Sequence, residues 1–241
     1  TAAITIWSKI INSEASKEVK NEALMNRAKV YLLISQPSLA LIDINNVKDF
    51  SSKYKFEIRL LRGIIYIQLE NYKLALYELD EAQRLDPSEP SVYANRHVAN
   101  KGLGKFKSAK NDLEIAISME PSLPNYYNLA VLERLSGDEQ KCIKLLNSIL
   151  DKSPTHLPSL EQRGLCFAEA GLHELSMKDM LVVFNIDPTN INALRQLGLS
   201  LVKKGDIKNG VKYLEKLSEI LLAQGNIIDY QKNLDLISSF K

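Results

Sequence analysis

Three histidines and two cysteines are the rarest side chains of this sequence that often act as nucleophiles, bases or metal ligands. His97, His156 and His173 are spread along the chain, and neither Cys142 nor Cys166 lies beside a histidine. Short spacings such as Cys-x-x-Cys or His-Glu-x-x-His mark many metal and catalytic sites, and neither spacing occurs here. We therefore expect no catalytic residue, no metal site and no cofactor, and we interpret both cysteines as small side chains of the core.

Composition narrows the class of protein. The 241 residues are 45% hydrophobic and 25% charged, which is typical of a globular chain rather than a disordered one. With 31 basic and 29 acidic residues, the net charge of +2 is too balanced for a protein that binds nucleic acid by neutralising phosphates. No apolar run approaches the ~18–20 residues that a membrane-spanning helix needs. Two cysteines cannot build a disulfide framework, so the chain does not need an oxidising compartment, although it could tolerate one.

Four prolines recur at a nearly constant interval. Pro87, Pro121, Pro154 and Pro188 are separated by 34, 33 and 34 residues. Two helical patterns and a short turn lie between successive prolines, and a glycine marks most of the turns. Glycine after a helix end and proline at the next helix start are common stop and start signals. No segment alternates in period two for long enough to predict a strand, so the sequence predicts an all-α chain of helix–turn–helix repeats.

The repeat resembles the tetratricopeptide repeat, a helix–turn–helix unit of 34 residues. Six successive frames match it: 21–54, 56–89, 90–122, 123–156, 157–190 and 191–224. The family needs a small residue at the eighth and twentieth positions, where the two helices cross closely. The eighth is small in five frames (Ala28, Gly63, Ala130, Gly164 and Gly198), and the twentieth in all six (Ala40, Ala75, Ala109, Cys142, Ser176 and Gly210).

The resemblance implies a right-handed α-solenoid of about six repeats with a flanking helix at each end. Residues 1–20 and 225–241 are the expected N-terminal and C-terminal capping helices, because a solenoid must cover its terminal hydrophobic faces. The alternative for either end is a surface that meets the rest of a longer protein.

One frame departs from the pattern at a position where size matters. His97 occupies the eighth position of the third frame, where the family has glycine or alanine. We interpret His97 as a hydrogen-bonded histidine in a locally splayed helix pair, and a functional role is the alternative.

A row of carboxamides is the first candidate binding feature. The resemblance implies that the second, fifth, sixth, ninth and twelfth residues of each frame face a concave groove. At the sixth position Leu61 is the exception, and the other five residues are carboxamides, namely Asn26, Asn95, Asn128, Gln162 and Gln196. A carboxamide offers donors and an acceptor that match a peptide group. The row resembles the asparagine ladder of superhelices in this family that hold extended peptides; the alternative is that these are ordinary exposed helix residues.

The fifth and ninth positions make the middle of the expected groove apolar, with Tyr127 as a candidate aromatic anchor. The candidate partner-binding site therefore combines the carboxamides with these apolar residues. Its members are Asn26, Leu60, Ile64, Asn95, Val98, Tyr127, Asn128, Val131, Gln162 and Gln196. The alternative is that neighbouring first helices partly bury the apolar members against each other.

A second binding mode of the family can be tested on residues alone. Members that bind acidic chaperone tails use Lys and Asn in one first helix, Asn in the next, and Lys and Arg in the third. The matching positions here are Leu60, Ile64, Asn95, Pro124 and Asn128. Without those cations nothing pairs with a terminal carboxylate, so we do not expect a receptor of the carboxylate-clamp type.

The function expected from these features is a non-enzymatic scaffold or adaptor that binds an extended peptide or an amphipathic helix of another protein in its groove. One alternative is a substrate-recruiting module of a longer enzyme or of a secretion or assembly machine. Another is a structural element that self-associates into a homo-oligomer. Because the sequence begins at Thr1 rather than Met, we expect a trimmed or processed chain.

Overall fold

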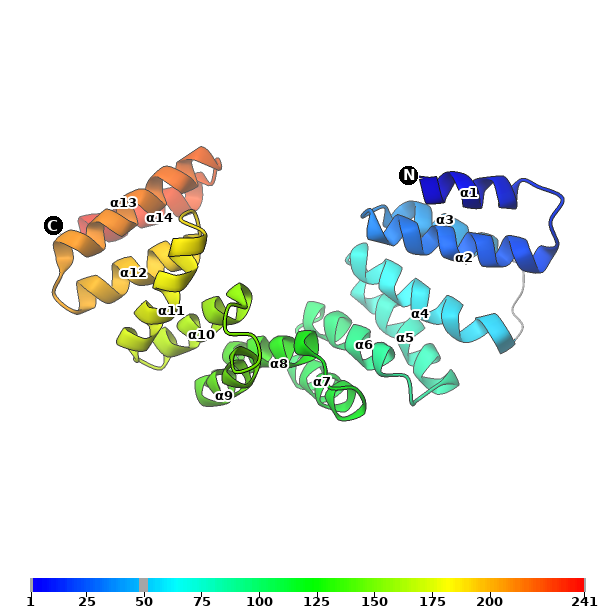
Figure 1. Cartoon of the computed structure of the whole chain (residues 1–241), viewed down its shortest axis with the longest axis horizontal. Helices are drawn as coiled ribbons and strands as arrows, with labels where there is room; N and C mark the ends of the chain where they lie inside the picture. Colours follow the sequence, from blue (N-terminus) through cyan, green and yellow to red (C-terminus); the bar gives the residue numbers. More distant parts are fainter. Residues whose placement is uncertain (1, 48–51, 241) are drawn as a thin grey trace. The chain divides into compact units, whose positions relative to one another are not determined.

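Successive helices of the chain pack as antiparallel pairs joined by tight turns, as the computed structural model of the chain shows (Figure 1). The structure describes residues 2–47 and 52–240, and in these ranges it contains helices and no strand. The helices are α1 (Ala2–Ile11), α2 (Lys17–Leu33), α3 (Pro37–Asn46), α4 (Ser52–Gln68), α5 (Tyr72–Leu85), α6 (Pro90–Gly102), α7 (Phe106–Met119), α8 (Leu123–Leu135), α9 (Glu139–Leu150), α10 (Leu157–Glu169), α11 (His173–Ile186), α12 (Ile191–Lys203), α13 (Ile207–Ala223) and α14 (Ile227–Ser238). The predicted all-α repeat fold, with one flanking helix at each end, is confirmed.

The chain divides into two compact units, residues 1–125 and residues 126–241. Unit 1 contains α1 and the pairs α2–α3, α4–α5 and α6–α7, and unit 2 contains most of α8, then α9, the pairs α10–α11 and α12–α13, and α14. The six repeat frames remain a prediction.

At the N-terminus, α1 ends at Ile11 and α2 begins at Lys17, because the Ser16 side chain accepts a hydrogen bond from the Val19 N–H and caps α2. The segment 1–20 therefore holds one short helix and the start of a second.

The turns inside the pairs need one residue with a positive φ, which glycine adopts without steric cost. Gly104 and Gly171 fill this position after α6 and α10, with φ values of 70° and 75°. The first two pairs have Ser35 and Glu70 there instead. The glycine signals of the sequence therefore mark real turns, and the two pairs without glycine adopt the same turn.

Small residues let the two helices of each pair approach closely. A Cβ atom added to Gly63 would lie 2.5 Å from Leu79 Cγ, and one added to Gly198 would lie 2.7 Å from Leu214 Cγ. Gly164 has the same role beside Met180. All residues at the eighth and twentieth positions of the frames are buried. This burial explains why the pattern demands small side chains there.

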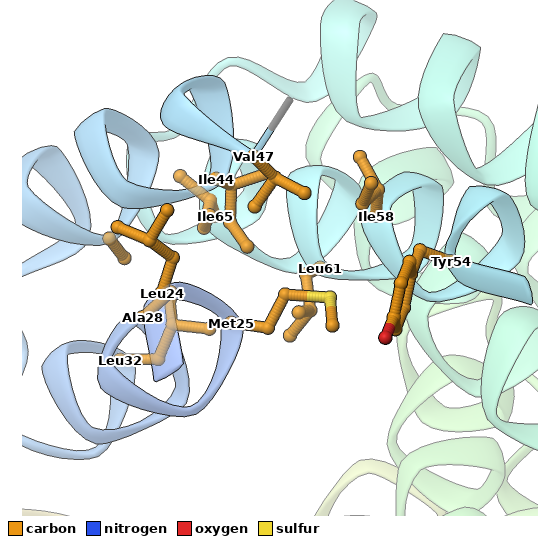
Figure 2. Close-up of a cluster of buried hydrophobic side chains, with 11 residues drawn as sticks. Leu24, Met25, Ala28, Leu32, Ile44, Val47, Tyr54, Ile58, Leu61 and Ile65 are labelled. Atoms are coloured by element: carbon orange, nitrogen blue, oxygen red, sulfur yellow. The ribbon is translucent and has the colours of Figure 1, made fainter. Parts of the chain in front are cut away.

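Apolar side chains from both helices of a pair, and from the next first helix, fill the space beside these crossings. In unit 1, Leu24 and Met25 from α2, Ile44 from α3, and Ile58 and Leu61 from α4 belong to one buried cluster (Figure 2). One core therefore joins α2, α3 and α4, and each pair buries its apolar face only by stacking on the next.

Ion pairs join the two helices in several repeats at a constant spacing. Arg27 donates two hydrogen bonds to Asp43, of 2.7 and 2.6 Å, across a separation of 16 residues, and this contact raises the pKa of the guanidinium. Arg163 and Asp179 repeat the arrangement at the same separation, with two bonds of 2.8 Å. In the pairs α8–α9 and α12–α13 the matching positions are apolar or aromatic, namely Leu129 with Leu145 and Leu197 with Tyr213.

Cys142 and Cys166 form a disulfide bond between α9 and α10. Both residues are fully buried, as expected for small core side chains, but the sequence analysis did not predict a bond between them. The sequence did not reveal the pairing because the residues are 24 positions apart and belong to different repeats. The bond adds a covalent link between neighbouring repeats of unit 2.

The third pair, α6–α7, has a polar interior. His97 is only 3% exposed, and its Nδ1 lies 2.5 Å from the Ala94 carbonyl oxygen, which confirms the interpretation as a hydrogen-bonded histidine. Burial lowers the pKa of His97 to about 4, with a smaller contribution from the nearby Lys101 ammonium. One turn later, Asn100 donates a 2.7 Å hydrogen bond to Asp112, whose pKa is raised by burial.

We expect Gly164→Leu to destabilise unit 2 by about 1–3 kcal/mol, because the new side chain would enter the space that Met180 occupies. The measurement is the urea midpoint followed by circular dichroism. Ser148→Leu, on the exposed side of α9, is the matched control and should leave the midpoint nearly unchanged. Equal midpoints for the two variants would contradict the close crossing at Gly164.

Reduction of the disulfide should lower the free energy of unfolding by about 3 kcal/mol, because the bond restricts the unfolded chain over a loop of this length. The experiment compares urea unfolding with and without a phosphine reductant. The Cys142→Ala/Cys166→Ala variant is the control and should not respond to the reductant. A wild type that is equally insensitive would show that the bond is absent or contributes nothing.

The stability of the chain should fall with decreasing pH because of His97. The unfolded histidine titrates near pH 6.5 and the folded one near 4, so unfolding takes up a proton between these values. The His97→Ala variant should therefore lose less stability than wild type between pH 7 and 4, by on the order of 3 kcal/mol. Asp112 acts in the opposite direction in both proteins, because its raised pKa favours the folded state as pH falls. Parallel pH profiles for the two proteins would exclude His97 as the cause.

Candidate functional site

All ten residues of the predicted site lie on the first helices of the pairs, and all are partly exposed. Five of them belong to unit 1, namely Asn26, Leu60, Ile64, Asn95 and Val98. The other five belong to unit 2, namely Tyr127, Asn128, Val131, Gln162 and Gln196. The site is therefore described separately for each unit.

In unit 1 the carboxamide row is interrupted. Leu61, which holds the sixth position on α4, is 5% exposed and belongs to the buried cluster of Figure 2. The Asn95 side chain donates a 2.7 Å hydrogen bond to the Ser91 carbonyl of its own helix. Ile64 packs against the buried cluster, as the alternative interpretation of the apolar residues proposed. Asn26 is thus the one carboxamide of this row that makes no hydrogen bond among the described residues of unit 1.

In unit 2 three carboxamides follow one another on α8, α10 and α12: Asn128, Gln162 and Gln196. Arg134 on α8 donates from Nε to Gln162 Oε1 at 3.1 Å, and its Nη1 lies 2.7 Å from Glu169 Oε1. The contact uses the Gln162 oxygen and leaves its NH2 group free to donate. Within the described part of unit 2, the side chains of Asn128 and Gln196 have no hydrogen-bond partner. We name these three residues the amide row.

An apolar row accompanies the amide row on the same three helices. Val131, Leu165 and Leu199 follow the three carboxamides by three residues each, which places each pair on one helix face. All three are partly exposed, and Leu165 also packs against a buried cluster of unit 2. Gln196 and Leu199 also line a cavity of about 150 Å³ between α10 and α12, together with Glu169 and Lys203. The amide row and the apolar row thus run over one face of unit 2, which we call the two-row face.

A hydrogen-bonded cluster lies beside the amide row, toward the start of the same helices. Glu161 on α10 accepts hydrogen bonds from Asn192 at 2.7 Å and from Asn190 at 3.0 Å, which joins α10 to the start of α12. Tyr127 contacts His156 edge to face, with ring centroids 6.2 Å apart. Burial raises the pKa of the Tyr127 hydroxyl, and the Glu161 carboxylate raises it further. Tyr127, the candidate aromatic anchor, therefore packs against His156 and lies near the hydrogen-bonded carboxylate of Glu161.

Sequence reasoning missed Arg134 and Glu169 as part of this face. Arg134 holds the twelfth position of its frame, and the resemblance assigns that position to the groove. Its place in the repeat could therefore have identified Arg134 as a site residue. Glu169 lies outside those positions, and only the structure brings it to Arg134. Arg134 and Glu169 thus orient the Gln162 side chain and do not form a further row of binding residues.

The described residues form no metal cluster, and the serine of the His156–Ser159 pair is buried. In residues 2–47 and 52–240 no group of three or more His, Cys, Asp or Glu side chains could hold a metal ion. His156 Nδ1 lies 2.7 Å from Ser159 Oγ, but Ser159 is fully buried in the first turn of α10 and cannot reach a substrate. No described helix is long and apolar enough to cross a membrane.

Comparisons with known proteins agree with the repeat. No family model matches the chain. Human tetratricopeptide repeat protein 13 is 26% identical over 162 residues, which are 63% of this chain and 19% of that protein. The chain thus spans about a fifth of this curated relative.

Two solved structures share the fold. One is a tetratricopeptide repeat protein from Parabacteroides merdae ATCC 43184, with a TM-score of 0.69 and 16% identity, covering 96% of this chain and 91% of the other. The other is YrrB, with a TM-score of 0.61 and 17% identity, covering 76% of this chain and 98% of YrrB. Together with the 34-residue period and the small residues at the crossings, these likenesses show that the chain has the fold of tetratricopeptide repeat proteins.

Proposed function

We propose that this chain is a non-enzymatic scaffold that binds an extended segment of another protein on the two-row face of unit 2. The observation that carries the proposal is the pairing of the amide row with the apolar row on α8, α10 and α12. Amide groups bind a peptide backbone whatever its side chains are, and the apolar row supplies contacts for one side of the bound segment.

The contacts around Gln162 favour the two-row face over the part of the predicted site that lies in unit 1. Because Arg134 occupies the oxygen of Gln162, the side chain cannot rotate freely, and its NH2 group is available to a peptide carbonyl. A donor that is already oriented loses less side-chain entropy on binding. In the described part of unit 1 only Asn26 remains available, because Leu61 is buried and Asn95 is bonded within its own helix.

The solved relative gives independent support for a peptide as ligand. YrrB is described as a tetratricopeptide repeat protein with an unusual peptide-binding site. Two other roles remain open: a recruiting module of a longer protein, since the chain spans 19% of a curated relative, and a self-associating element. In both cases the two-row face would bind a polypeptide, from a substrate or from a second copy of this chain.

We expect the Gln162→Ala/Gln196→Ala variant to bind peptide about tenfold more weakly than wild type, because it loses two hydrogen-bonding groups on one face. Peptides selected on an array with the wild-type chain would be measured by fluorescence anisotropy. Gln140→Ala/Asn185→Ala is the matched control, since both side chains are exposed on second helices. The control should bind as wild type does.

Two outcomes would contradict the proposal. Equal affinities for all three proteins would place the binding site elsewhere. Failure of the wild type to select any peptide, with concentration-dependent dimers in sedimentation, would favour the self-associating alternative.

A further inference from the structure

A second cavity lies in unit 1, apart from the two-row face. It has a volume of about 450 Å³ and lies where the end of α1, the α1–α2 loop, one side of α2 and the end of α3 meet. Cavities of this size accept small organic ligands.

The cavity has an apolar part. Ile11 from α1, Ala15 from the loop and Leu24 from α2 line it. Leu24 belongs to the buried cluster of unit 1 (Figure 2). Ile11 packs against that cluster, so the core fixes this part of the wall. An apolar group placed here would lose contact with water on the side that faces the core.

Two lysines give the cavity its charge. Lys17 and Lys20 line the cavity from the first turn of α2, and neither forms an ion pair with any described residue. Arg27 also lines it, but its guanidinium is bound to Asp43 and to Ser8, so its charge is already matched. None of the lining residues is acidic.

The nearby carboxylates do not line the cavity. Glu18 and Glu22 both lie within hydrogen-bond distance of the Tyr54 hydroxyl, at 3.3 and 3.1 Å, and neither lines the cavity. Glu14, which precedes Ala15, is exposed and does not line it either. The cavity therefore combines an apolar wall with two cations that have no anionic partner.

We propose that this cavity binds a small amphipathic carboxylate, with its hydrocarbon part against Ile11, Ala15 and Leu24 and its carboxylate between Lys17 and Lys20. A neutral hydrocarbon would gain nothing from the two ammonium groups, which are partly in water. A short anion would leave the apolar wall empty, so only a ligand with both parts matches the whole cavity. The proposal concerns a different unit from the peptide-binding face and does not depend on it.

The test uses octanoate, with octan-1-ol and acetate as probes that lack the charge or the chain. Each probe is titrated into the ¹⁵N-labelled full chain, and the amide signals of residues 11–27 are followed by NMR. Octanoate should bind at least tenfold more tightly than either of the other probes, and its signals should map to this segment.

Three variants connect the result to the cavity. Lys17→Gln/Lys20→Gln should reduce the affinity for octanoate to that for octanol, and Ala15→Trp, which fills the cavity, should abolish both. Lys73→Gln/Lys107→Gln, with two exposed lysines elsewhere in unit 1, should bind octanoate as wild type does. The spectrum of each variant shows whether it is folded.

Equal affinity for the three probes, no saturable shift in residues 11–27, or full octanoate affinity in Lys17→Gln/Lys20→Gln would each overturn the proposal.

Discussion

The close approach of two helices at one small residue determines how each repeat of this protein is built. Where Gly164 faces Met180, or Gly198 faces Leu214, no space remains for a Cβ atom, so the crossing point is fixed along both helices. Once that point is fixed, the crossing also determines which residues of each first helix face away from its partner helix. The two-row face therefore depends on residues that lie on the opposite side of the same helices.

This dependence explains how far the sequence could predict the molecule. Prolines, glycines and small residues recur with the period of one repeat, so the helices and turns were predictable from local signals. The candidate site was predictable only as positions on first helices. Leu61 turned into the core, and Asn95 bonded to Ser91, because neighbouring side chains rather than the period decide what remains exposed. The Cys142–Cys166 bond depends on how two repeats stack, which no spacing within a repeat encodes.

The third repeat shows what happens when the small-residue rule is broken. A histidine at the crossing brings a ring that must be hydrogen-bonded and uncharged, and Asn100 and Asp112 extend the polar interior next to it. Buried polar groups of this kind stabilise the fold only while their partners and protonation states are maintained. The repeat therefore keeps its place in the array but gains a buried histidine whose protonation opposes folding.

The ion pairs between helices bear on how a chain of near-identical repeats avoids incorrect pairing. In unit 2 the α10–α11 pair has Arg163 opposite Asp179, whereas the adjacent pairs have Leu129 with Leu145 and Leu197 with Tyr213. If α10 formed a hairpin with α9 or α13 instead, Arg163 would face Leu145 or Tyr213 and would be buried without a counter-charge, which is strongly unfavourable. In unit 2 the alternation of charged and apolar pairs thus makes exchange of partners between neighbouring repeats costly, whereas each of the three pairs of unit 1 carries an ion pair at this spacing.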